Sequence, residues 1–206
     1  SAQGGQPVRD ALRFIAGRHN LLVLFVVLLV VSTFAFNQQV VFPKLADLKW
    51  GGDQSFGYVL GVMSIGSLTG ALLTARLRHV SLRWYFGNAV VLSVTAIGIA
   101  WAPNIWVAFL WAMPMGLGAS GFITAANAIM QQESPSDMRG RLMALQAVVF
   151  LGSTPIGGPI TGVIADQVSV EWALAYGSVI SLLVVAAASV YWLATVRRRA
   201  ETALAR

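Results

Sequence analysis

Polar side chains recur at helical spacing inside a long apolar stretch near the middle of the chain. Ser120, Thr124, Asn127 and Gln131 are separated by four, three and four residues. At about 100° per residue, this spacing places all four on one stripe of an α-helix. Because an unbonded amide in hydrocarbon is costly, such a stripe faces a partner helix or a wet cavity. We interpret it as one wall of a substrate cavity, and hydrogen bonding that only joins helices is the alternative.

A shorter polar stripe lies in the first apolar stretch of the chain. Thr33 and Asn37 are four residues apart, and Gln38 follows directly. We expect these three side chains to belong to the same cavity wall. Gln146 and Ser153, seven residues apart in a later stretch, favour contacts between helices instead. Asp, Glu, His, Lys and Arg are absent from the middle of every stretch, so these residues offer no ionisable proton relay.

A polar segment, Gln131–Arg141, separates two long apolar stretches, and its proline blocks helix continuation. Arg139 and Arg141 can pair with Glu133 there, or reach the arginine-rich loop around residue 76. One interpretation is a cytoplasmic latch, a gate that forms in one conformation and breaks in another. The other interpretation is that these arginines only supply the positive charge of the cytoplasmic side and contact lipid headgroups. The latch would comprise Glu133, Asp137, Arg139, Arg141 and Arg76.

Two short motifs in the fourth apolar stretch resemble those of enzymes. Gly116–Gly121 reads G-x-G-x-x-G, but the dinucleotide fingerprint needs a strand before it and a helix after it. Inside one apolar stretch, these glycines indicate helix packing. The same residues include a G-x-S-G resembling that of rhomboid intramembrane proteases, whose serine needs a histidine base in the sixth span. His19 and His79 both lie far upstream of that position, so an intramembrane serine protease is a remote alternative. We expect no catalytic residue, cofactor or metal.

The composition of the 206 residues indicates an integral membrane protein. Charged residues make up 11%, less than half of the about 25% usual in soluble domains, and hydrophobic residues make up 57%. A spanning helix needs about 20 apolar residues, and six stretches approach or exceed that length. We predict an all-α membrane protein with six transmembrane helices at residues 21–42, 56–77, 84–102, 105–130, 142–165 and 172–196, between a linker or interfacial segment (1–20) and a basic tail (197–206).

The basic residues are distributed unequally between the two sides of this predicted membrane protein. Lys44 and Lys49 lie on one side, and the other 12 of the 14 Lys and Arg residues lie on the opposite side. The excess of positive charge marks the cytoplasmic side, which places both termini there. The net charge of +6 could also suggest a nucleic-acid partner. Because the arginines lie at the ends of spans, we expect no nucleic acid.

The six stretches form two triplets with a weak internal repeat. The middle member of each triplet is rich in glycine, and glycines four residues apart let a neighbouring helix backbone approach closely. With three spans per triplet, the second copy must insert upside down. The sequence therefore predicts two inverted three-helix repeats, which are typical of secondary transporters. The glycines are Gly57, Gly61, Gly66 and Gly70, and then Gly152, Gly157, Gly158 and Gly162.

Three segments carry a family resemblance. They are the polar segment ending in Arg139-Gly140-Arg141, the Gly-Ser-Thr-Pro-x-Gly run at Gly152–Gly157, and Asn37 followed by Pro43. Over residues 21–196 the chain resembles the C-terminal half of a major facilitator superfamily transporter. The resemblance is closest to the bacterial drug-exporter branch that includes the enterobactin exporter, and the Arg-Gly-Arg segment is its most specific part.

The resemblance implies half of a major facilitator fold in the bacterial inner membrane. Its first and fourth spans would line a central cavity, the second and fifth would flank it, and the third and sixth would face lipid. The partner would be the missing N-terminal six-helix half or a second copy. We expect alternating-access export of small amphipathic molecules of the drug or siderophore class, as by an antiporter. A non-transporting six-helix scaffold or accessory subunit is the competing hypothesis.

Overall fold

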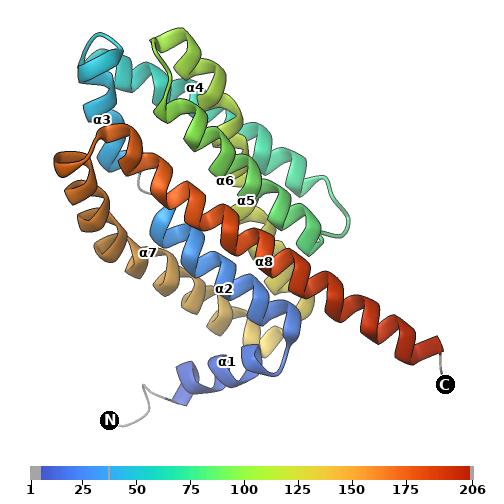
Figure 1. The fold of residues 1–206 in the computed structure, drawn as a ribbon. Helices are drawn as coiled ribbons and strands as arrows, with labels where there is room; N and C mark the ends of the chain where they lie inside the picture. Colours follow the sequence, from blue (N-terminus) through green and yellow to red (C-terminus); the bar gives the residue numbers. More distant parts are fainter. Residues whose placement is uncertain (1–5, 37, 205–206) are drawn as a thin grey trace.

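The computed structural model of the chain is an all-helical bundle (Figure 1). It describes residues 6–36 and 38–204, with side chains at residues 9–36, 40–52, 54–153 and 155–196. The predicted all-α class is confirmed. The helices are α1 (Gln6–Ala16), α2 (His19–Phe34), α3 (Gln38–Lys49), α4 (Asp53–Ala75), α5 (Leu82–Ala100), α6 (Ile105–Glu133), α7 (Ser136–Gln167) and α8 (Val170–Leu204).

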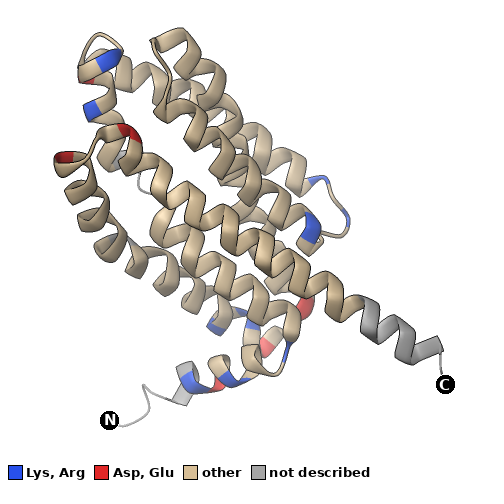
Figure 2. Ribbon diagram, in the orientation of Figure 1, with Lys and Arg blue, Asp and Glu red and all other residues tan. Residues whose placement is uncertain are grey.

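The helices have the length and surface of membrane spans. Five of them, α4 to α8, are long and apolar enough to cross a bilayer. If the bent pair of α1 and α2 counts as one span, the number of spans is six. Charged residues gather at the two ends of the bundle and leave its middle uncharged (Figure 2). Exposed aromatic rings lie toward the two ends of the bundle: Trp106 and Trp172 near the starts of α6 and α8, and Tyr191 beside His19 at the start of α2. Such rings prefer the level of the lipid headgroups, so the chain is a multi-pass membrane protein.

The first predicted span differs from the structure because it is broken. α2 ends at Phe34 and α3 begins at Gln38, inside the stretch 21–42 that we predicted as one helix. Pro43 lies in the second turn of α3. Its ring lacks an N–H and crowds the carbonyl four residues earlier, which disfavours one straight helix through this region. Hydrophobic length alone does not reveal such a break.

The polar segment between the fourth and fifth spans is mostly helical, unlike the prediction. α6 continues to Glu133 and α7 starts at Ser136, which leaves Ser134 and Pro135 as the turn. Pro135 has φ −65°, the value that its ring fixes and that suits a helix start. The polar ends of both helices therefore extend the spans beyond their apolar stretches. α8 likewise continues through the predicted basic tail, whose arginine side chains lie outside the described residues.

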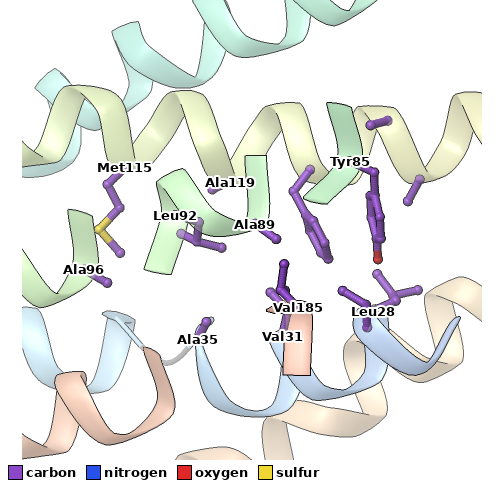
Figure 3. Packing of buried hydrophobic residues seen from close by; sticks show 14 of the residues in the cluster. Leu28, Val31, Ala35, Tyr85, Ala89, Leu92, Ala96, Met115, Ala119 and Val185 are labelled. Carbon is purple, nitrogen blue, oxygen red and sulfur yellow. The ribbon is translucent and has the colours of Figure 1, made fainter. Parts of the chain in front are cut away.

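Helices α2, α5, α6 and α8 enclose the core (Figure 3). Tyr85 of α5 is fully buried, and its ring stacks on that of Phe122 of α6 with centroids 4.5 Å apart. Its hydroxyl donates a 3.0 Å hydrogen bond to the carbonyl of Leu24 in α2. α5 is the most buried of the five spans, since 56% of the residues in its apolar stretch are buried inside the bundle. The expectation that the third span faces lipid is therefore wrong for most of α5, because α2, α6 and α8 cover it.

Glycines bring α4, α5 and α6 into backbone contact. A Cβ atom on Gly66 would lie 1.9 Å from the carbonyl oxygen of Met113, and one on Gly116 would lie 1.9 Å from that of Met63. A Cβ on Gly118 would lie 2.6 Å from a backbone nitrogen of α5. No larger residue fits at these positions without separating the helices. The G-x-G-x-x-G run thus packs helices, as predicted.

Candidate functional site

The polar stripe of α6 lies on the side of that helix that its neighbours leave open. α6 packs extensively on α4 and α5 and much less on α7. Ser120, Thr124 and Asn127 are half-buried, and Gln131 is exposed. The opposite face of α6 holds the buried apolar side chains. The four residues therefore share one face of α6, as their spacing predicts.

Two cavities open on this face of α6. Asn127 lies between them along the helix. The first, of about 340 Å³, is lined by Phe36, Met63, Ser67, Ala119, Ser120, Ile123 and Thr124. The second, of about 370 Å³, is lined by Ala128, Gln131, Gln132 and Arg139.

Phe36 is a cavity residue that the sequence analysis did not identify. It lies in the break between α2 and α3, where an unbroken span was expected. Its ring centroid is 6.3 Å from that of Phe122 in α6 and 5.1 Å from that of Phe150 in α7. The break thus places one aromatic ring against both of the long helices. The adjacent run of amides, starting at Asn37, was the available signal for an irregular backbone.

Thr33, the one predicted residue of the first span whose side chain is described, is not brought to these cavities. Thr33 is buried, and its hydroxyl donates a 2.7 Å hydrogen bond to the carbonyl of Leu29 in its own helix. Asn37 and the side chain of Gln38 lie outside the described residues. Gln146 and Ser153 of α7 are buried, 7% and 2% exposed. The hydroxyl of Ser153 donates to the carbonyl of Phe150 in its own helix at 2.7 Å, so the predicted contact between helices stays a prediction.

Glu133 bonds to an amide at the end of the bundle where α6 meets α2. The Nδ2 of Asn20 donates to its carboxylate at 2.6 Å, and the Nε1 of Trp192 donates to the Oδ1 of Asn20 at 3.2 Å. Arg18 also donates to the backbone carbonyl of Glu133. These bonds join α2, α6 and α8, so the start of the first span and the end of the last lie at one end of the bundle.

The two arginines at the start of α7 bond elsewhere, and neither pairs with Glu133 in this conformation. The Nε of Arg139 donates to the carbonyl of Ser134 at 3.1 Å. Arg141 lies 3.6 Å from the carboxylate of Asp10 in α1. α1 packs on the start of α7, which brings its acidic residue within reach of that guanidinium. The prediction missed this pair because sequence spacing shows only neighbours on the same helix.

The end of α6 does contact the loop between α4 and α5, through an amide. In the orientation that satisfies both of its groups, the side chain of Gln132 donates to the carbonyl of Val80 at 3.1 Å and accepts from its N–H at 3.0 Å. The same amide donates to Nδ1 of His79 at 2.6 Å. Arg76 and Asp137 are exposed, and their side chains have no ion pair or hydrogen bond within the described part of the chain.

Two ion pairs hold the opposite end of the bundle together. Lys44 pairs with Asp166 at the end of α7, and Lys49 pairs with Glu171 at the start of α8. Both lysines belong to α3, so this short helix is fixed across the turn between α7 and α8. The second pair is the less exposed, with side chains 28% and 22% exposed against 43% and 67% for the first.

Comparison with known proteins establishes the family. A family profile for transmembrane secretion effectors, within the major facilitator superfamily, matches residues 3–205. The chain belongs to this family. It is similar to the gentisate transporter of Corynebacterium glutamicum, at 31% identity over 65% of this chain and 28% of the relative. It is also similar to the multidrug efflux pump Tap of Mycolicibacterium fortuitum, at 29% identity over 76% of this chain and 39% of the relative.

The matches cover only part of each relative. A third relative, a homologue of the multidrug resistance efflux pump PmrA from Lactococcus lactis, is 31% identical over 38% of this chain and 19% of its own length. The chain thus spans between 19% and 39% of the curated relatives that it matches. No solved structure matches the chain. The family and the names of the relatives indicate membrane transport.

The geometry agrees with a transporter family rather than with the protease alternative. Ser120 lies at a cavity in the middle of α6. The two histidines of the chain lie elsewhere: His19 packs on the ring of Tyr191 with centroids 4.9 Å apart, and His79 contacts Gln132. Neither imidazole is near enough to activate this serine.

Proposed function

We propose that this chain is one six-helix half of an alternating-access exporter in which the open face of α6 forms one wall of the substrate path. The half would be the C-terminal one, in the bacterial inner membrane with both termini in the cytoplasm. The observation that carries the proposal is that the polar stripe of α6 lines two cavities of small-molecule size, since ligand pockets have about 300–1,000 Å³.

The chemistry of the cavity walls favours an amphipathic substrate. Hydroxyl and amide groups from Ser120, Thr124 and Gln131 offer hydrogen bonds, whereas Phe36 and Met63 offer apolar contact. A molecule of the drug or siderophore class combines both kinds of surface. The names of the relatives, two multidrug efflux pumps and a gentisate transporter, support a small organic substrate.

A second six-helix unit would supply the opposite wall. α4 and α7 flank the open face of α6, and both present apolar side chains such as Leu68 and Leu151, 63% and 69% exposed. A Cβ on Gly61, Gly152 or Gly158 would meet nothing within 4 Å, so a partner backbone could approach these helices closely. The companion would be an N-terminal half or a second copy of this chain.

Transport in proteoliposomes tests the proposal. A labelled amphipathic drug should accumulate or be released faster with the protein, supplied with its companion half, than in empty vesicles. Thr124→Val should weaken transport about five- to tenfold through the loss of one hydrogen bond. Thr69→Val is the matched control, because that hydroxyl bonds to the carbonyl of Ile65 in its own helix and lines neither cavity. If Thr124→Val lowers transport no more than Thr69→Val does, the cavity assignment is wrong.

The same assay separates the exporter from a non-transporting scaffold or accessory subunit. The scaffold hypothesis is favoured by one observation, that the described helices present a single wall of the substrate path. A scaffold would give the empty-vesicle rate under every condition. Because the chain has no cysteine, a single Gly61→Cys can report the companion. A disulfide-linked dimer of this chain would indicate that the companion is a second copy. If no such dimer forms and transport requires an added N-terminal half, the companion is that half.

A further inference from the structure

The short helix α1 has two distinct surfaces. Ala11 and Ile15 are 1% and 4% exposed and pack against the bundle. Leu12, beside them on the helix, is 53% exposed, although it is a large apolar side chain. Arg9 and Arg13 follow on the next part of the helix surface, and both are exposed. An apolar strip next to a basic strip is typical of helices that lie in a membrane interface.

The orientation of α1 matches a position along the membrane surface. α1 and α2 meet at 114° across the break at Gly17 and Arg18. Because α2 runs with the spans, α1 lies nearer to the membrane plane than to its normal. Figure 1 shows α1 leaving the bundle sideways, at the end where α2 starts and α7 starts.

Two positive charges of α1 have no partner among the described residues. Asp10, the acidic residue of this helix, is paired with Arg141 of α7 at 3.6 Å. Arg18 lies 4.2 Å above the ring of Phe14 and donates to a backbone carbonyl of α6. By contrast, the guanidinium groups of Arg9 and Arg13 have no hydrogen bond or ion pair among the described residues. Two like charges four residues apart destabilise an isolated helix, so an anionic surface beside them would stabilise this one.

We propose that α1 binds anionic phospholipids of the adjacent leaflet, with Arg9 and Arg13 at the headgroups and Leu12 at the acyl boundary. The occupant is identified by charge complementarity and by the exposed leucine, because a leaflet offers anionic headgroups and acyl chains side by side. The inference depends on the membrane class of the chain and not on the proposed export. The pair of Asp10 and Arg141 would then connect the lipid surface to the start of α7.

Lipid quenching of a single fluorophore tests this site in the full chain. The chain has no cysteine, so Leu12→Cys gives one labelling position. The labelled chain is reconstituted in phosphatidylcholine vesicles with or without phosphatidylglycerol, with bromine on the acyl chains near the headgroup. Each arginine near an anionic surface contributes about fivefold to binding, so two contribute about 30-fold. We therefore expect strong quenching only with phosphatidylglycerol, and its loss in about 1 M salt.

The charge variants decide whether the arginines are responsible. Arg9→Gln with Arg13→Gln should reduce quenching to the level in phosphatidylcholine alone. Arg76→Gln with Arg78→Gln removes the same charge from the loop between α4 and α5 and should leave quenching unchanged. The four side chains are exposed, so each variant should keep the helical circular dichroism of the parent. Quenching that is absent, equal in both lipids, insensitive to salt, or unaffected by the α1 variant would overturn the proposal.

Discussion

The amide of Asn20 donates a 2.6 Å hydrogen bond to the carboxylate of Glu133 and thereby joins the start of α2 to the end of α6. The same side chain accepts from the indole of Trp192 in α8. One amide thus connects three helices that are far apart in sequence. Because its partner Glu133 is charged, this is the stronger class of hydrogen bond.

Replacing Asn20 should destabilise the bundle without altering its cavity. We expect Asn20→Ala to lower the free energy of unfolding by about 1–2 kcal/mol, because it removes a bond to a charged group and leaves an indole N–H unpaired. Thermal unfolding in detergent, followed by tryptophan fluorescence, measures the loss as a fall of a few degrees in the midpoint. Asn127→Ala is the control, since that amide has no hydrogen bond in the described part of the chain. Equal midpoints for the two variants would contradict this account.

The close approach of α4 and α6 gives a second prediction. Gly66→Ala places a Cβ where it would lie 1.9 Å from the carbonyl of Met113, so the two helices must move apart. We expect a loss of about 1–3 kcal/mol, typical of overpacking. Gly61→Ala is the matched control on the same helix, because its Cβ would meet nothing within 4 Å. A Gly61→Ala variant that is as unstable as Gly66→Ala would contradict this account, because alanine has the higher helix propensity and its Cβ at position 61 meets nothing.

The two ion pairs of α3 should differ in strength. Exposed pairs contribute about 0–1 kcal/mol, since water and salt screen them. The pair of Lys49 and Glu171 is less exposed than that of Lys44 and Asp166 and should therefore have the larger coupling energy. Double-mutant cycles with alanine, read by thermal unfolding at low and high salt, measure both couplings. We expect the difference to shrink in high salt, and a larger coupling for Lys44 with Asp166 would contradict the argument.

The sequence predicted the features that depend on local chemistry. Helical spacing placed Ser120 and Thr124 on one face, and apolar length gave five of the helices nearly as they are. Positions set by packing between distant segments were missed. Arg141 pairs with Asp10, about 130 residues away in the chain, and spacing along one helix cannot reveal such a partner. The break after Phe34 was hidden because apolar residues resume at Val40 after the amides, so the length of the apolar stretch did not reveal it.

The break between α2 and α3 leads to the last prediction, on substrate selectivity. Phe36 lines the cavity of about 340 Å³ and contacts Phe122 and Phe150, so its ring limits the volume next to Ser120. In the transporting protein, Phe36→Ala should enlarge this cavity and raise kcat/KM for bulky substrates relative to small ones. Phe36→Ala should lower the free energy of unfolding by less than Phe122→Ala. The ring of Phe122 is fully buried, and removing such a ring costs about 3–5 kcal/mol.

Proteoliposome transport with a series of substrates of increasing size measures this selectivity. Phe56→Ala serves as the control, because that partly buried ring lies outside both cavities of α6. If Phe36 bounds the substrate path, the ratio of rates for large and small substrates rises in Phe36→Ala and stays constant in Phe56→Ala. If the ring only supports the break, both variants lower all rates by the same factor, because loss of folded protein does not discriminate between substrates.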